Sequence, residues 1–370
     1  MENYKKIFAT LTLTLSLNLP LYAMTSPDEA REGAVSHTRY YLSDDMLSST
    51  SPQHLITSSN FQDYLSLAKK DDKIAQYQVG TCFESGQGTS RNLQKAVKWY
   101  RLSAENGDLL GQCALARCYE EGIGIARDLP EALKWYTAAV EQGDIAANYN
   151  LGTCKFKIAC THSNENGEVG ELVLESFSYI LKAAKAGVVE AEYRVGEMII
   201  EGHHIKIMRQ RSKVPGWFLR AAEKGHVKAQ CELAKCFHTG FDGMQNPRKV
   251  NFEKAVEWYE KSEKGGSADA KLNLAVLRFK GQGTERNIPK AIGSFKELAE
   301  QGNPYAQYNL SLCYKKGEGV EKNKEKASEL YLAAKKQGLH LPSKWGFNKK
   351  PSFMFKRLRC YNRLLTPIND

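Results

Sequence analysis

A six-residue pattern recurs along this chain at intervals close to 36 residues, and it constrains the fold more than any other feature. The segment Ala-Gln-Tyr-Gln-Val-Gly begins at Ala75 and returns in related form at Gly111 and Ala147. Three of the later intervals are longer, and the later copies begin at Ala191, Ala229, Ala270 and Ala306. Such self-similarity is typical of proteins that stack one supersecondary unit. We therefore divide the repetitive part into seven units: 75–110, 111–146, 147–190, 191–228, 229–269, 270–305 and 306–341.

Each unit is predicted to form two helices joined by a glycine loop. The second helix carries an aromatic pair such as Trp99-Tyr100, with small residues such as Ala104 after it. Large side chains opposite small ones let helices approach to roughly 8–10 Å. The first helix ends at a glycine, which adopts positive φ without a Cβ penalty; these glycines are Gly86, Gly122, Gly202, Gly240, Gly281 and Gly317. One helix pair cannot bury its apolar face alone, so neighbouring pairs must stack into an all-α solenoid.

The residues also support a resemblance to a known family. Units one and two carry Lys95-Ala96-x-x-Trp99-Tyr100 and Glu131-Ala132-x-x-Trp135-Tyr136 after a Gly-x-Gly loop. This pattern resembles the Sel-one-like repeat (SLR) family, a relative of tetratricopeptide repeats, over about 270 residues. The resemblance implies a right-handed α/α superhelical solenoid of about seven helix-turn-helix repeats. Units three and four depart from the pattern, since unit three lacks the Gly-x-Gly and unit four has Gly202-His203-His204 instead, so we expect irregular stacking there.

The N-terminal residues predict export. Lys5 and Lys6 precede a short apolar stretch, and Ala23 is a small residue at the expected cleavage point. This order is typical of a signal peptide, here residues 1–23. We expect a flexible Ser/Thr-rich linker over 24–59 and a capping helix over 60–74. The mature protein is then periplasmic or secreted, in a bacterium by the family resemblance.

The C-terminal residues 342–370 form a basic tail. The chain has a formal net charge of +10, and the tail holds seven basic residues against one acidic residue. The repeats are nearly balanced in charge, so we do not expect nucleic-acid binding. One interpretation is a helix that caps the last repeat. The other is a basic amphipathic helix that binds an anionic membrane surface or an acidic partner, through Lys356, Arg357, Arg359 and Arg363.

Nine cysteines in an exported chain raise the question of disulfides. Five of them share the eighth position of their units, and equivalent positions in stacked repeats lie beyond the Cα–Cα limit of about 7 Å for a disulfide. We therefore expect buried packing cysteines, with Cys154 and Cys160 as the most plausible exception. The five are Cys82, Cys118, Cys154, Cys236 and Cys313.

We predict no enzymatic site, cofactor or metal. Ser66-x-x-Lys69 has the spacing of a penicillin-binding nucleophile, but the companion Ser-Asp-Asn and Lys-Thr-Gly motifs do not occur in the sequence. His203 and His204 stand near Glu197 and Glu201, yet adjacent histidines on a helix point apart. The alternatives left open are a cell-wall enzyme or enzyme regulator, and a protein held at a membrane surface by its tail.

The family resemblance implies a monomeric scaffold that binds proteins or peptides, in host interaction or envelope maintenance. In such solenoids the first helices line the concave face, and positions three, seven and ten of each unit point into it. Tyrosine and arginine there supply contact area and forked hydrogen bonds. The alternative is that position three packs within its own unit. The candidate groove residues are Tyr77, Arg117, Tyr149, Tyr193, Lys235 and Tyr308.

Overall fold

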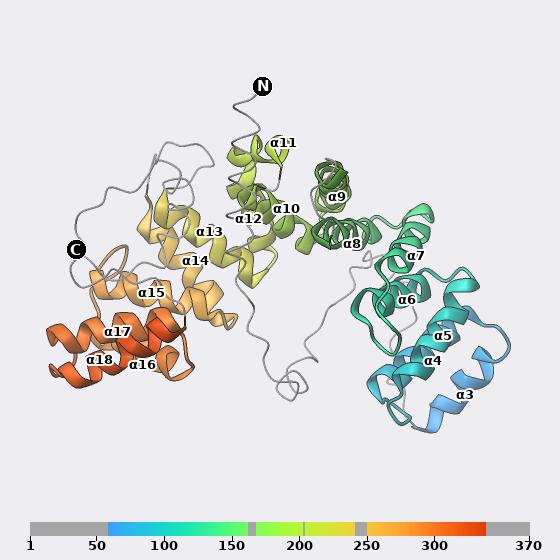
Figure 1. The fold of residues 1–370 in the computed structure, drawn as a ribbon, viewed down its shortest axis with the longest axis horizontal. Coiled ribbons are helices and arrows are strands. Elements are labelled where there is room, and N and C mark those ends of the chain that lie inside the picture. Colours follow the sequence, from blue (N-terminus) through green and yellow to red (C-terminus); the bar gives the residue numbers. More distant parts are fainter. Residues whose placement is uncertain (1–57, 162–167, 203, 241–249, 338–370) are drawn as a thin grey trace. The chain divides into compact units, whose positions relative to one another are not determined.

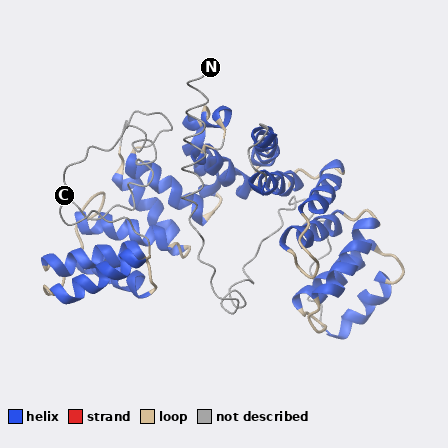
Figure 2. Cartoon of the chain, in the orientation of Figure 1, coloured by secondary structure: helices blue, strands red, loops and turns tan. Residues whose placement is uncertain are grey.

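A computed structural model describes residues 58–161, 168–202, 204–240 and 250–337 (Figure 1). Within these ranges the chain forms helices joined by short loops and turns, with no strand (Figure 2). None of the described helices is both long and apolar enough to cross a membrane. The predicted signal peptide, most of the linker and the basic tail lie outside the described residues.

The helices follow one another as pairs, and each pair consists of a first and a second helix. The first helices are α4 (Lys73–Ser85), α6 (Leu109–Glu121), α8 (Ala147–Thr161), α10 (Val189–Glu201), α13 (Val227–Thr239), α15 (Ala268–Lys280) and α17 (Pro304–Lys316). The second helices are α5 (Leu93–Glu105), α7 (Leu129–Glu141), α9 (Glu168–Lys185), α12 (Val214–Glu223), α14 (Phe252–Lys264), α16 (Ile288–Glu300) and α18 (Lys324–Lys336). Each helix packs against the next, as expected for a solenoid of stacked pairs.

Two parts of the chain add to the pairs. Helix α3 (Ser58–Ala68) precedes the first pair and packs on α4 through Phe61 and Ala68, both buried. The short helix α11 (Ile205–Met208) and a 3-10 turn (Arg211–Lys213) stand between α10 and α12. The fourth pair is therefore irregular, at the place where its loop departs from the repeat pattern.

Local sequence signals set the helix ends. The side chain of Asn92 accepts a hydrogen bond from the Lys95 amide at 2.9 Å, and Asp128 caps α7 in the same way. Such caps satisfy an amide that has no partner inside the helix. Six first helices end at a glycine with positive φ, at the positions that the sequence predicts: Gly86, Gly122, Gly202, Gly240, Gly281 and Gly317.

The core confirms the expected packing of large side chains on small ones. Tyr100, Tyr136 and Tyr259 of the second helices are almost fully buried. A Cβ on Gly80 would lie 2.6 Å from the ring of Tyr100, so a larger residue there would force the ring to shift. The small residues of the first helices are thus what allows the aromatic rings to enter.

Buried glutamines link neighbouring pairs. The amide of Gln307 donates to the carbonyl of Ala299 at the end of α16, at 3.2 Å. The Gln307 carbonyl accepts from Gln337, just after α18, at 3.0 Å. Gln112 makes the same two bonds, to Ala104 and Gln142. A repeated polar contact therefore joins the end of one pair to the end of the next.

The eight described cysteines are all free, and seven of them are buried. Cys154 and Cys160, the pair left open as a possible disulfide, are both free thiols, and Cys160 is exposed. The buried thiols fill space between helices, which is the packing role that the repeat register predicts.

Candidate functional site

Positions three, seven and ten of the first helices form what we call the first-helix face. Helix α4 contacts α6 directly, so the face is continuous over the first two pairs. Over the first three pairs most of its side chains are partly exposed, and its members there are Tyr77, Thr81, Glu84, Cys113, Arg117, Glu120, Tyr149, Thr153 and Phe156.

An ion pair between Glu84 and Arg117 connects the first two helix pairs across this face. Both terminal nitrogens of Arg117 on α6 bind the carboxylate of Glu84 on α4, at 2.6 and 2.5 Å. The same carboxylate accepts the hydroxyl of buried Tyr100 at 2.6 Å. Burial raises the pKa of Glu84, and the bond from Tyr100 opposes that shift. Forked hydrogen bonds of this kind fix the Arg117 guanidinium in one orientation.

The next pair repeats the arrangement in altered form. Glu120 on α6 is 7% exposed and accepts the Tyr136 hydroxyl at 2.9 Å. Lys157 on α8 lies 2.8 Å from the other carboxylate oxygen. The sequence prediction omitted Glu84 and Glu120 from the candidate residues. The sequence did contain a signal for them. Glu84 and Glu120 both stand at position ten of their units, and the first helix of the next unit carries a basic residue, Arg117 or Lys157.

The side chain of Tyr193 is mostly buried against residues of its own repeat unit. It is 7% exposed, and its hydroxyl donates to Glu197 at 2.6 Å. Its ring stacks on the His226 ring with centroids 4.5 Å apart. His226 caps α13 by accepting the Ala229 amide, and its other ring nitrogen lies 2.9 Å from Glu190.

The side chain of Lys235 is also mostly buried. It is 8% exposed, and its amine donates to Glu232 at 2.7 Å. Burial is the largest single influence and favours the neutral amine, but Glu232, Cys231 and Asp269 together outweigh it, so the pKa of Lys235 is raised. Lys235 is therefore a charged group committed to an internal ion pair.

The remaining tyrosines differ in exposure. Tyr77 is partly exposed, with its ring 5.8 Å from that of Tyr100, and burial followed by Asp108 and Glu84 raises its pKa to about 12. Tyr149 is also partly exposed and packs on the core around α9 and α10. Tyr308 is 6% exposed, and its ring lies 6.2 Å from that of Tyr331. The most accessible candidates are thus Tyr77, Arg117 and Tyr149.

The Ser66-x-x-Lys69 segment lies at the end of α3 and beyond it. Both residues are exposed, and the Ser66 hydroxyl donates to the backbone carbonyl of Asp63 at 2.9 Å. A nucleophile needs a base within hydrogen-bond reach. The hydrogen bond that Ser66 makes is to the backbone of its own helix, and its acceptor is not a side-chain base.

The histidine candidates gather no metal ligands in the described part of the chain, which has no cluster of three His, Cys, Asp or Glu side chains that could hold an ion. His203 lies outside the described residues. His204 accepts a hydrogen bond from the Lys206 amide at 3.1 Å. The tail candidates Lys356, Arg357, Arg359 and Arg363 also lie outside the described residues.

The repeats match a known family model. The model of the Sel1 repeat matches six segments: 73–108, 109–144, 216–226, 227–267, 268–303 and 304–339. The segment 145–215 between them holds the third expected unit and much of the fourth. The chain there still forms the pairs α8–α9 and α10–α12.

Solved structures share the fold. One is a protective antigen present in uropathogenic Escherichia coli strains, which displays an SLR fold; it is 24% identical with a TM-score of 0.63. The match covers 83% of this chain and 63% of that protein. A Sel1 repeat protein from Oxalobacter formigenes is 23% identical with a TM-score of 0.53, over 76% of this chain and 77% of that one. No curated protein matches the chain.

Proposed function

Because this chain belongs to the Sel1 repeat family, whose members are typically protein-binding scaffolds, we propose that it binds a protein or peptide along its first-helix face. The scaffold is non-enzymatic and exported, and it acts in host interaction or in maintenance of the cell envelope. The export segment at residues 1–23 supports this location.

The observation that carries the proposal is the ion pair between Glu84 and Arg117. It links the first helices of two pairs, so a ligand meets one continuous surface rather than separate hairpins. It also fixes Arg117 before a ligand arrives, which lowers the entropy that binding costs. Tyr77 on α4 and Tyr149 on α8 present partly exposed side chains at position three of their units. Tyr193, Lys235 and Tyr308 occupy the corresponding positions of α10, α13 and α17, where they are mostly buried.

A binding experiment separates this face from the tail. The mature chain 24–370 and the truncated chain 24–341 are used to capture partners, which are identified by mass spectrometry. We expect both to retain the same partner. A partner lost with residues 342–370 would place binding on the tail instead.

A matched pair of variants then locates the surface. Thr153 on α8 and Thr137 on α7 are both partly exposed, and each hydroxyl donates to a carbonyl of its own helix. Thr153 lies on the first-helix face and Thr137 on a second helix. We expect Thr153→Arg to weaken partner binding at least tenfold and Thr137→Arg to leave it unchanged. Equal effects of the two changes would contradict the proposal.

Export has its own test. N-terminal sequencing of protein from the producing cell should begin at Met24, directly after Ala23. A mature protein that keeps residues 1–23 in the cytoplasm would overturn this part of the proposal.

A further inference from the structure

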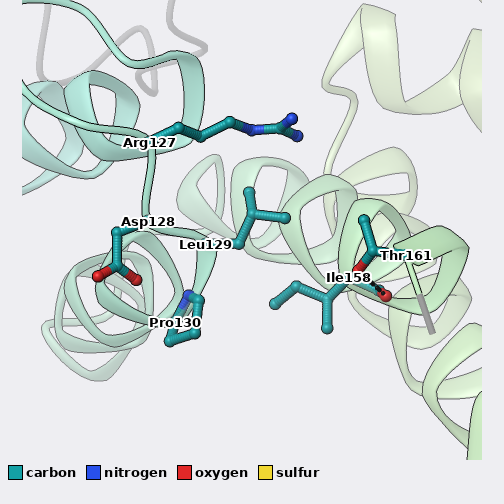
Figure 3. A pocket seen from close by; sticks show the side chains of 6 residues that line it. All are labelled: Arg127, Asp128, Leu129, Pro130, Ile158 and Thr161. Carbon is teal, nitrogen blue, oxygen red and sulfur yellow. Dashed lines mark hydrogen bonds between the residues drawn. The ribbon is translucent and has the colours of Figure 1, made fainter.

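One of the first helices begins at a histidine cap. The Nδ1 atom of His226, the residue before α13, accepts a hydrogen bond from the backbone amide of Ala229 at 3.0 Å. In α4, α6, α15 and α17 an aspartate, serine or asparagine accepts the equivalent amide, and these caps are Asp72, Asp108, Ser267 and Asn303. Asp128 has the same role for α7, at the point where the chain enters that helix (Figure 3). Among the described first helices, α13 alone is capped by an imidazole.

This cap requires one protonation state of the ring. A backbone amide can only donate, so the Nδ1 atom of His226 must carry a lone pair rather than a proton. The other ring nitrogen, Nε2, lies 2.9 Å from a carboxylate oxygen of Glu190 on α10 and therefore carries the proton of the neutral ring. The neutral ring thus bonds to two first helices at once, to α13 through Nδ1 and to α10 through Nε2.

A second proton on the ring changes the balance between these two contacts. In the imidazolium both nitrogens are donors, so Nδ1 can no longer accept the Ala229 amide. The hydrogen bond to Glu190 then becomes an ion pair. The ring of Tyr193 on α10 is stacked on the imidazole with centroids 4.5 Å apart, and its π face attracts a cation. Protonation of His226 therefore strengthens both contacts to α10 and removes the contact to α13.

The other charged groups near this turn are held elsewhere. The amine of Lys224, at the end of α12, donates to a carboxylate of α10 and to a backbone carbonyl. On α13 itself, Lys228 is exposed and Glu232 accepts the amine of a lysine on the same helix. Helix α14 reaches the turn through the hydroxyl of Ser262, which donates to a backbone carbonyl at 2.9 Å and does not titrate. The charge of the ring is therefore set chiefly against the carboxylate and the tyrosine of α10.

We propose that His226 is a pH-sensitive switch at the junction of the fourth and fifth helix pairs. The neutral ring holds the first turn of α13, and the protonated ring releases that turn while it stays bound to α10. Imidazole side chains change charge roughly between pH 5 and pH 8, so mild acid is sufficient. Both helices carry residues of the first-helix face, Tyr193 on α10 and Lys235 on α13. The switch changes how these two parts of the face are joined, and it does not depend on what the face binds.

The predicted effect is local. Protonation loses one cap, which destabilises the start of α13, but it gains an ion pair and a cation–π contact, which stabilise the ring against α10. These effects oppose each other in the free energy of unfolding of the whole chain. The Ala229 amide reports the switch directly, because the neutral ring is its acceptor.

Hydrogen–deuterium exchange, read at single amides by mass spectrometry with fragmentation, tests the switch on the mature chain 24–370. Labelling times are scaled to the intrinsic exchange rate at each pH. Relative to that rate, the Ala229 amide should exchange about fivefold faster or more at about pH 5.5 than at about pH 7.5. The Ala306 amide is the internal control, because its acceptor Asn303 does not titrate. Its relative rate should be the same at both pH values.

Two variants separate the charge of the ring from general effects of acid. His226→Asn supplies a cap that does not titrate, so the protection of Ala229 should become independent of pH. Glu190→Gln removes the negative charge that favours the imidazolium, so release of Ala229 should move to a pH roughly one unit lower. Both variants keep His238 on the same helix, so an effect of that histidine would persist in them. Circular dichroism verifies that each variant is folded.

Four results would overturn the proposal. The first is exchange at Ala229 that does not depend on pH, and the second is an equal increase at Ala306. The third is the same increase at Ala229 in His226→Asn as in the wild type. The fourth is an unchanged pH of release in Glu190→Gln, which also serves as the test if His226→Asn does not fold.

Discussion

At the scale of single residues, glycines decide how closely the helices approach. Gly80 lies inside α4 directly beneath the Tyr100 ring, whereas Gly293 lies inside α16 with no atom near the place of a Cβ. The same residue type therefore serves packing at one position and has no packing role at the other. This contrast gives a prediction with an internal control.

Gly80→Ala should destabilise the protein by about 1–3 kcal/mol, because the new methyl group overlaps the Tyr100 ring. Gly293→Ala should be neutral or stabilise by up to about 1 kcal/mol, because alanine favours an exposed helix. Chemical denaturation of both variants and the wild type measures the difference. Similar effects of the two changes would contradict the packing described for Tyr100.

A half-buried histidine, His238, predicts a loss of stability in acid. Burial, followed by the nearby charge of Lys280, lowers the pKa of His238 to about 4. The unfolded chain takes up this proton near pH 6.5, so the contribution is complete above that pH and is lost as the pH falls toward 4. His238→Gln should therefore reduce the loss of stability between about pH 7 and about pH 4.5, by on the order of 1–2 kcal/mol.

Thermal unfolding of the wild type and His238→Gln at both pH values provides the measurement. Between about pH 7 and about pH 4.5, the melting temperature of the wild type should fall further than that of the variant. An identical loss in both proteins would mean that His238 stays accessible to protons in the folded state.

The sequence identified the residues of the first-helix face by repeat position, but it did not reveal which of them are covered. Tyr77 and Tyr193 share position three, yet Tyr193 is stacked on His226 and bonded to Glu197. Those partners are the N-cap residue of α13 and a residue one turn further along α10. Exposure depends on such contacts, which a repeat register does not contain.

At the scale of helices, the glycine pattern correctly predicted where six of the first helices end. It did not show what happens where the pattern is missing. In the third unit Ile158 takes the place of the glycine, and an isoleucine stays in the helical conformation, so α8 runs on to Thr161. The absence of one glycine thus lets α8 continue past the position at which six other first helices end.

The glutamine links predict how strongly successive pairs are coupled. Gln307→Met keeps the side-chain volume but removes the bonds to Ala299 and Gln337, and it leaves the carbonyl of Ala299 without that donor. We expect a loss of about 1–3 kcal/mol in unfolding free energy, measured by urea titration. Gln337→Ala, at an exposed position, should stay within about 0.5 kcal/mol of the wild type. A loss for Gln337→Ala as large as that for Gln307→Met would contradict this account.

At the scale of the whole molecule, the repeat period together with the glycine and aromatic pattern of each unit predicted an all-α chain of stacked helix pairs, because one such unit cannot bury its apolar face unaided. The same register predicted that the cysteines pack between helices, and seven of the eight described thiols are indeed buried. The partner could not be predicted in this way. Ligand choice depends on side chains that differ between units, such as Arg117 and Thr153, rather than on those that repeat.

The most direct test of the proposed scaffold is site-specific photo-crosslinking in the producing cell. Benzoylphenylalanine replaces Thr153 on the first-helix face in one protein and Thr137 on α7 in the other. Our account predicts that a partner protein crosslinks from position 153 and not from position 137. Crosslinks from position 137 alone, or from neither position, would contradict binding along the first helices.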